Sequence, residues 1–142
     1  MEGRGLIRQL MVAEIVPGSR ILIVEDVQET RDSIEDLLKH DGYRVDAARD
    51  EIEAMERAER NHPDLILVSL AGAPEGVIAA AQRIRLRGRL SQHTPIVIFS
   101  LGIVPQGAEE ELSGNIYVTV PDNFNQLRAL LTRILRGASR TH

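Results

Sequence analysis

The 142-residue sequence contains no cysteine and no tryptophan. Without thiols the chain cannot form disulfides, use thiolate catalysis or hold a metal through cysteine. Its two Tyr and two Phe provide few stacking platforms for nucleic-acid bases. No apolar run approaches the roughly 20 residues of a membrane span. We therefore expect a protein without a membrane-spanning segment, located in the cytoplasm.

Lysine is nearly absent, because Lys39 is the single lysine among 17 basic residues. The net charge is −4 and unevenly spread: residues 76–108 contain no acid but carry four arginines. Such a basic stretch would suit nucleic acid, but the acidic total and the few aromatics favour a solvated arginine face. We expect no nucleic-acid partner.

Three short apolar runs end in polar residues: 21–24 before Glu25 and Asp26, 65–68 before Ser69, and 95–99 before Ser100. Runs of this length predict strands that are buried on both faces, as in a parallel sheet covered by helices. In such sheets ligands bind at the carboxyl ends of the strands. The polar residues that close the runs are therefore candidate site residues.

Helical and strand patterns alternate along the rest of the chain. We predict helices over 29–40, after Asp50, over 77–86, over 104–113 and after Asn123, and further strands over 43–47 and 116–120. Asp50 and Asn123 precede Glu53 and Gln126 at capping-box spacing. Five alternations predict an α/β protein, a three-layer doubly wound parallel sheet of five strands. The predicted domain covers 19–137, between an extension at 1–18 and a tail at 138–142.

Several segments together carry a family resemblance: RILIVEDVQETRDSIEDLLKHDGYRV, HPDLILVSL, PIVIFS and YVTVP. In this order the chain resembles the receiver domain of bacterial two-component response regulators. The resemblance implies the flavodoxin-like strand order 2-1-3-4-5 and a role in phosphorelay signal transduction.

The resemblance also implies roles for single residues. Glu25 and Asp26 match the family's Mg²⁺-binding acids, and Ser100 matches the hydroxyl that ends the fourth strand. Tyr117 matches the switch aromatic. Pro121 matches the proline that follows the fifth strand, where the family geometry suggests a cis peptide bond.

Two positions depart from the family pattern. Ser69 stands where the family has its phosphoacceptor aspartate, and Val120 stands where it has a lysine. Asp64 cannot replace the acceptor, because five residues of extended strand put it about 16 Å away. A serine hydroxyl needs a general base to act as a nucleophile. We therefore expect a degenerate pseudo-receiver without phosphotransfer, and not an enzyme.

Mg²⁺ prefers several oxygen ligands in octahedral geometry. With Glu25 and Asp26 as the two remaining acids, we expect only a weak residual metal site and no tightly bound cofactor. Glu75 or Asp122 are candidates for a third ligand. An acid pair after a strand also serves as an ordinary helix-capping or surface feature.

The preferred hypothesis is a stand-alone receiver-like module that binds a protein partner without being phosphorylated. Its partner would be a histidine kinase or another signalling protein, with a homodimer as a further alternative. The expected contact faces are the helix at 104–113 with the strand at 116–120 and the last helix, or the first helix. Two other hypotheses stay open: a response regulator phosphorylated on Ser69 or a nearby carboxylate, and a small-ligand-binding flavodoxin-like domain.

Overall fold

The computed structural model of the protein describes residues 18–100 and 102–140. The predicted extension lies outside the described residues except for Gly18, and so does the end of the predicted tail. The elements are β1 Arg20–Glu25, α2 Gln28–His40, β2 Arg44–Ala48, α3 Glu51–Asn61, β3 Leu65–Ser69, α4 Pro74–Arg87, β4 Ile96–Phe99, β5 Glu109–Leu112, β6 Ile116–Thr119 and α5 Phe124–Arg140.

The strands form one six-stranded sheet in the order β2-β1-β3-β4-β6-β5. The pairs from β2 through β6 are all parallel, and β5 pairs antiparallel with β6. The five parallel strands follow the predicted flavodoxin-like order, so the predicted fold class is confirmed. The sixth strand adds an antiparallel edge that the sequence analysis did not predict.

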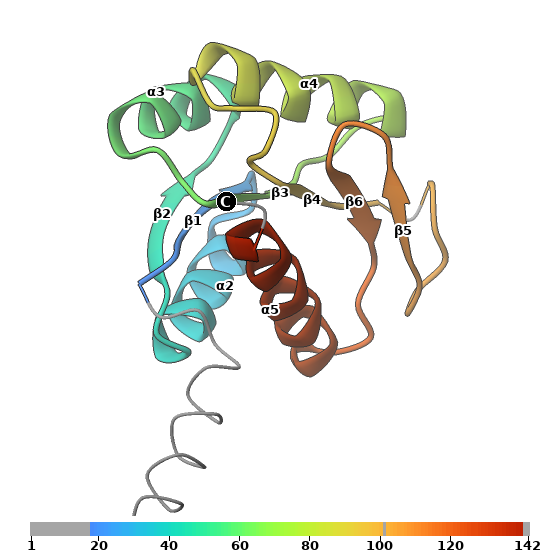
Figure 1. The fold of residues 1–142 in the computed structure, drawn as a ribbon. Helices are drawn as coiled ribbons and strands as arrows, with labels where there is room; N and C mark the ends of the chain where they lie inside the picture. Colours follow the sequence, from blue (N-terminus) through green and yellow to red (C-terminus); the bar gives the residue numbers. More distant parts are fainter. Residues whose placement is uncertain (1–17, 101, 141–142) are drawn as a thin grey trace, which may run out of the picture.

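Two pairs of helices cover the sheet and complete the three layers (Figure 1). The helices α3 and α4 pack on one face, and α2 and α5 on the other. The buried strands β1, β3 and β4 supply alternate side chains to the two cores because successive residues of a strand point to opposite faces. Among the described residues, no helix has both the length and the apolar character needed to cross a membrane.

Both predicted capping side chains are in place at the helix starts, while Glu53 and Gln126 accept from the amides of Arg49 and Asp122, one residue before each cap. The Glu53 amide donates to Asp50 Oδ1 at 2.8 Å, and the Gln126 amide donates to Asn123 Oδ1 at 3.0 Å. These side chains satisfy amides that have no partner inside the helix. The capping residues therefore fix where α3 and α5 begin at the carboxyl edge of the sheet.

The predicted helix over 104–113 is wrong, because this segment contains β5 instead. A three-residue loop joins β5 to β6, and in it Gly114 and Asn115 have φ values of 81° and 63°. These left-handed conformations suit a tight hairpin and interrupt a helix. Pairing with β6 then outweighs the weak helical pattern. The helix α4 also begins earlier than predicted, at Pro74, which is accepted in the first helical turn because it needs no amide partner there.

One contact face expected for a partner changes with this correction. The face expected from a helix at 104–113 is instead bordered by the edge strand β5, whose Glu109, Glu110 and Glu111 are all exposed. An acidic strand edge therefore stands where a helical surface was predicted.

The peptide bond before Pro121 is trans, so the expectation of a cis bond is wrong. The backbone of Val120 is held by the hairpin: its amide donates to the Ala108 carbonyl at 3.3 Å, and its carbonyl accepts from the Gly107 amide at 2.6 Å. The chain therefore enters α5 through the isomer that X-Pro bonds usually prefer.

Candidate functional site

The carboxyl ends of the parallel strands bring most of the candidate residues to one edge. Glu25 at the end of β1 lies directly beside Ser69 at the end of β3 in the sheet register. The Ser100 amide donates to the Thr119 carbonyl at 3.3 Å, which places Ser100 beside the end of β6 and Val120. The predicted clustering at one edge follows from the parallel topology.

Glu25 is buried, with only 3% of its surface exposed. Its Oε2 accepts a hydrogen bond from the Val27 amide at 2.9 Å. Burial raises the pKa of the Glu25 carboxyl above its ordinary value, because water no longer solvates the charge. Hydrogen bonds from Val27 and Ser69 oppose this shift, and the neighbouring Asp26 adds to it.

Asp26 is exposed and lies across from the loop that follows β3. Its Oδ2 accepts a hydrogen bond from the Ala71 amide at 3.3 Å. On the other side, the Arg31 guanidinium donates to the Glu25 backbone carbonyl at 2.8 Å. The end of β1 is therefore tied both to the β3 loop and to α2.

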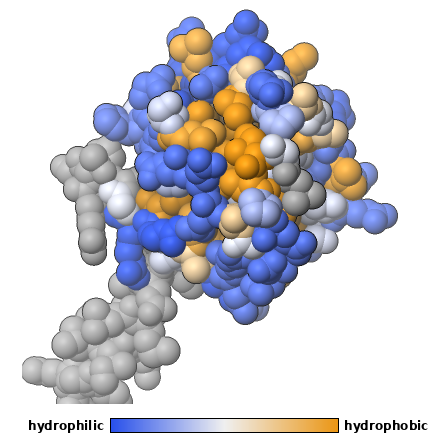
Figure 2. Space-filling view, turned by 90° about the vertical axis from the view of Figure 1, so that its right-hand side faces the viewer, coloured by the Kyte–Doolittle hydropathy of each residue, from blue (hydrophilic) through white to orange (hydrophobic). Residues whose placement is uncertain are grey.

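The loops after β3 and β4 touch each other at this edge. A Cβ atom added to Gly102 would lie 2.4 Å from Pro74 Cγ, so only a residue without a side chain fits there. Leu70, Ile103 and Val120 pack partly buried against the core under these loops. Figure 2 shows apolar side chains gathered in a strip between hydrophilic flanks on the side that bears β5 and β6.

Two carboxylates at this edge, Glu25 and Asp26, are the candidate ligands of a Mg²⁺ ion. Within residues 18–100 and 102–140, no group of three or more His, Asp or Glu is placed to hold a metal. Glu75 lies in the first turn of α4. The Asp122 carboxylate lies against Gly107, where an added Cβ would meet Asp122 Oδ2 at 2.6 Å. Glu25 and Asp26 remain the candidate ligands of a weak site, and we derive no chemical step through a metal.

The single lysine lies at the opposite edge of the sheet from the acid pair Glu25 and Asp26. Lys39 occupies the last turn of α2, where its Nζ contacts Glu35 Oε2 at 2.8 Å. Because α2 runs back against the strands, its last turn is at the amino edge of the sheet. The described His40, His62 and His93 also lie at that edge, at the ends of α2 and α3 and before β4. The Lys39 amine and the imidazoles of the three described histidines are therefore separated from Ser69.

Tyr117 does not join the residues at the carboxyl edge. It is the second residue of β6 and faces α5, where it packs with the apolar side chains of the second core. Burial raises the pKa of its hydroxyl, Glu111 raises it further, and Arg133 lowers it. Sequence reasoning placed Tyr117 on a strand correctly but had no signal for these two charged neighbours.

An open doubly wound sheet with an acid pair at its carboxyl edge defines a flavodoxin-like α/β protein. Comparison with known families then gives a specific assignment, since the response regulator receiver domain matches residues 21–135. The chain belongs to the response regulator receiver domain family. The resemblance seen in the sequence is thereby confirmed.

Two curated relatives are similar over most of this chain. The response regulator MprA of Mycobacterium sp. (strain KMS) is 25% identical over 122 residues, covering 84% of this chain and 52% of MprA. The response regulator ArlR of Staphylococcus aureus (strain Mu50 / ATCC 700699) is 28% identical over 120 residues, covering 83% and 53% respectively. This chain thus spans about half the length of these relatives.

Solved structures show the same fold. A CheY-like receiver domain protein from Methanospirillum hungatei JF-1 has a TM-score of 0.70 at 19% identity, covering 88% of this chain and 99% of that one. The anti-anti-sigma factor PhyR from Bartonella quintana has a TM-score of 0.69 at 22% identity, covering 97% and 56% respectively.

The raised pKa of Glu25 predicts a measurable stability change. Between the ordinary and the raised pKa, the Glu25 carboxyl is ionised in the unfolded chain but still protonated in the folded protein. The free energy of unfolding therefore falls as the pH rises through this window. We expect Glu25→Gln, which keeps an acceptor for the Val27 amide, to stabilise the fold at pH 7 and to remove this part of the pH dependence. Urea unfolding at pH 4 and pH 7 measures this.

The exposed Glu29 supplies the control for that measurement. Glu29→Gln removes a carboxylate that is exposed in the first turn of α2, so it shows what neutralising an unburied glutamate does to unfolding. A Glu25→Gln protein that is less stable than the wild type at pH 7 would show that the Glu25 charge is stabilising.

Proposed function

We propose that this receiver domain acts as a pseudo-receiver, a signalling module that works through protein–protein contact without being phosphorylated. The observation that carries the proposal is the placement of Ser69 beside Glu25 at the end of β3. We take this position to be that of the family's phosphoacceptor. A hydroxyl there is a far weaker nucleophile than a carboxylate next to a metal.

The residue at the end of β6 supports the same proposal. Val120 lies partly buried against the apolar core, and Lys39 is at the opposite edge of the sheet. Without an ammonium group, nothing at Val120 would pair with phosphoryl oxygens. Loss of one carboxylate together with one ammonium keeps the local net charge unchanged, which explains how the fold accepts both changes.

A second candidate function rests on one specific observation, the position of Ser69 directly beside the buried Glu25 in the sheet register. A carboxylate with a raised pKa is a better proton acceptor than an ordinary one. In this alternative Glu25 would take the Ser69 proton while the Ser69 oxygen attacks the phosphorus of an acyl phosphate, which releases its carboxylate and leaves a phosphoserine. The described histidines at the other edge offer no base for that step.

Incubation of the full chain with Mg²⁺ and acetyl phosphate, followed by intact-mass measurement, tests the proposal. We expect an unchanged mass. A stable gain of one phosphoryl group would overturn the pseudo-receiver assignment. Ser69→Ala and Asp26→Asn would then show which residue carries the group. Treatment with alkali would identify the linkage, because alkali cleaves an acyl phosphate much faster than a phosphoserine.

We further propose a cytoplasmic protein partner, either a histidine kinase or another signalling protein. The family assignment supports this class of partner, since receiver domains work by contact with other signalling proteins. Two surface features of this chain are candidates for that contact: the apolar strip on the side that bears β5 and β6 (Figure 2), and the acidic edge strand β5.

A further inference from the structure

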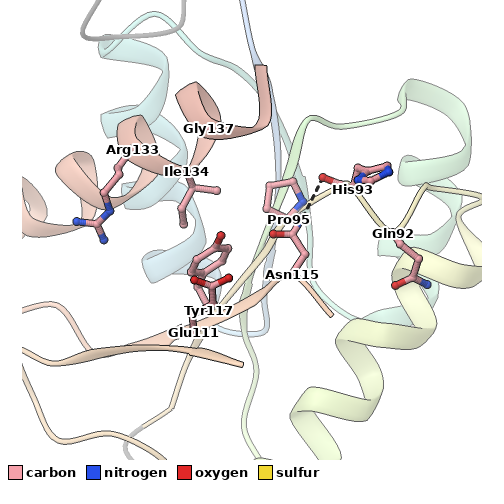
Figure 3. Close-up of a pocket in the computed structure, with 9 residues that line it drawn as sticks. All are labelled: Gln92, His93, Pro95, Glu111, Asn115, Tyr117, Arg133, Ile134 and Gly137. Carbon is pink, nitrogen blue, oxygen red and sulfur yellow. Dashed lines mark hydrogen bonds between the residues drawn. The ribbon is translucent and has the colours of Figure 1, made fainter. Parts of the chain in front are cut away.

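A cleft of about 520 Å³ opens between α5, the β5–β6 hairpin and the segment before β4. Figure 3 shows Tyr117, Glu111 and Ile134 together at its centre, Arg133 on one side, and Pro95 on the other. The volume lies within the range of ordinary ligand sites. Its walls combine an aromatic ring and aliphatic groups with charged side chains.

The strand register places one carboxylate directly beside the aromatic ring. Glu111 and Tyr117 are opposite each other in the antiparallel pair, so their side chains share the face toward α5. Glu109 lies on the same face and forms an ion pair with Arg133. Within the part of the chain that the structure describes, the Glu111 carboxylate has no hydrogen bond or ion pair.

The charges of the cleft therefore do not balance. Arg133 is neutralised by Glu109, whereas Glu111 has no counter-ion, and these three groups leave one net negative charge. The neighbouring Tyr117 ring offers a negative π face, which attracts cations. Ile134 and Pro95 provide apolar surface for the methylene groups of a long side chain.

We propose that this cleft is a binding site for a basic side chain, an arginine in particular, of a protein partner. The guanidinium would pair with the Glu111 carboxylate and lie over the Tyr117 ring, while its stem contacts Ile134. A planar guanidinium suits this set because it can form two parallel hydrogen bonds to one carboxylate and stack on an aromatic face.

The cleft is separate from the acid pair. It lies at the amino ends of β4 and β6 and beside the end of α5, whereas Glu25 and Ser69 lie at the carboxyl edge. The inference rests on the proposed function only in taking a partner protein as the source of the arginine. Phosphorylation of Ser69 would overturn the pseudo-receiver proposal and leave the arginine site untouched.

Tyrosine fluorescence gives a direct test, since the chain has no tryptophan and only two tyrosines. In the full chain carrying Tyr43→Phe, the emission reports on Tyr117 alone. Titration with N-acetyl-arginine amide is expected to change it saturably. The neutral N-acetyl-citrulline amide should bind at least about fivefold more weakly, because an exposed ion pair and a cation–π contact are lost together.

Two neighbouring glutamates of β5 provide matched variants. Glu111→Gln should weaken N-acetyl-arginine amide binding by about fivefold or more, whereas Glu110→Gln, on the opposite face of the strand, should leave it unchanged. Equal binding of the citrulline and arginine probes, or equal losses in the two variants, would overturn the site. Tighter binding of free arginine than of the capped probe would show that the ligand is a free metabolite and overturn the partner assignment.

Discussion

The combined substitutions Ser69→Asp and Val120→Lys are expected to give a chain that takes up one phosphoryl group from acetyl phosphate, while the wild type takes up none. The aspartate would supply a carboxylate nucleophile beside Glu25 in the register. The lysine would supply the cation that offsets the charge of the transferred group. Intact mass in the presence of Mg²⁺ measures the gain.

The single substitutions separate the two contributions. Val120→Lys alone should gain no phosphoryl group, because it adds no carboxylate to accept one. Ser69→Asp alone should be phosphorylated more slowly than the double variant. It should also unfold more easily without Mg²⁺, since a third carboxylate would join Glu25 and Asp26. If the double variant folds and its mass still does not change, residues other than these two have disabled the site.

Arg128→Met should destabilise the protein by about 2 kcal/mol, between the costs of breaking an exposed and a buried ion pair, because the Arg128 side chain is itself 38% exposed. Arg128 Nε and Nη2 donate to the two carboxylate oxygens of Asp41 at 2.7 and 3.1 Å, and the Asp41 side chain is only 7% exposed. The pair joins α5 to the turn after α2. Urea unfolding with an unchanged m-value would report this loss as a shift of the midpoint.

A second substitution tests the cause of that loss. Most of it should reflect the Asp41 charge left without a partner, so Asp41→Asn added to Arg128→Met should restore a large part of the stability. If the double variant is as unstable as Arg128→Met, the loss comes instead from missing packing. The Arg128 guanidinium also lies 4.8 Å from the Phe124 ring centroid, a contact that both variants lose.

The sequence was sufficient to predict the parallel core of the sheet and the two capping residues, Asp50 and Asn123. Short apolar runs predicted β1, β3 and β4, because runs of this length between polar ends are typical of strands buried on both faces. The segment 104–113 is different, because its helical pattern is weak: Gly107 lies inside it and Gly114 directly follows it. The three residues before Ile116 were a local signal for a hairpin turn. The strand β5 is nevertheless fixed by its pairing with β6, which is a tertiary contact that no local pattern specifies.

The candidate site was predictable to a similar degree. The ends of β1 and β3 put Glu25 beside Ser69 once the sheet was known to be parallel. The tie from Asp26 to the Ala71 amide depends on a loop conformation that no local pattern specifies. The unpaired state of Glu111 depends on α5 bringing Arg133 to Glu109 rather than to Glu111.

The hairpin at the end of the sheet has a consequence for how copies of this protein behave at high concentration. An uncovered outer strand is a template on which chains stack into continuous sheets and aggregates. Here that strand carries Glu109, Glu110 and Glu111, so two copies meeting along it would bring six carboxylates together. Their repulsion should keep the hairpin from seeding fibres, and it would be lost if the three glutamates were made neutral.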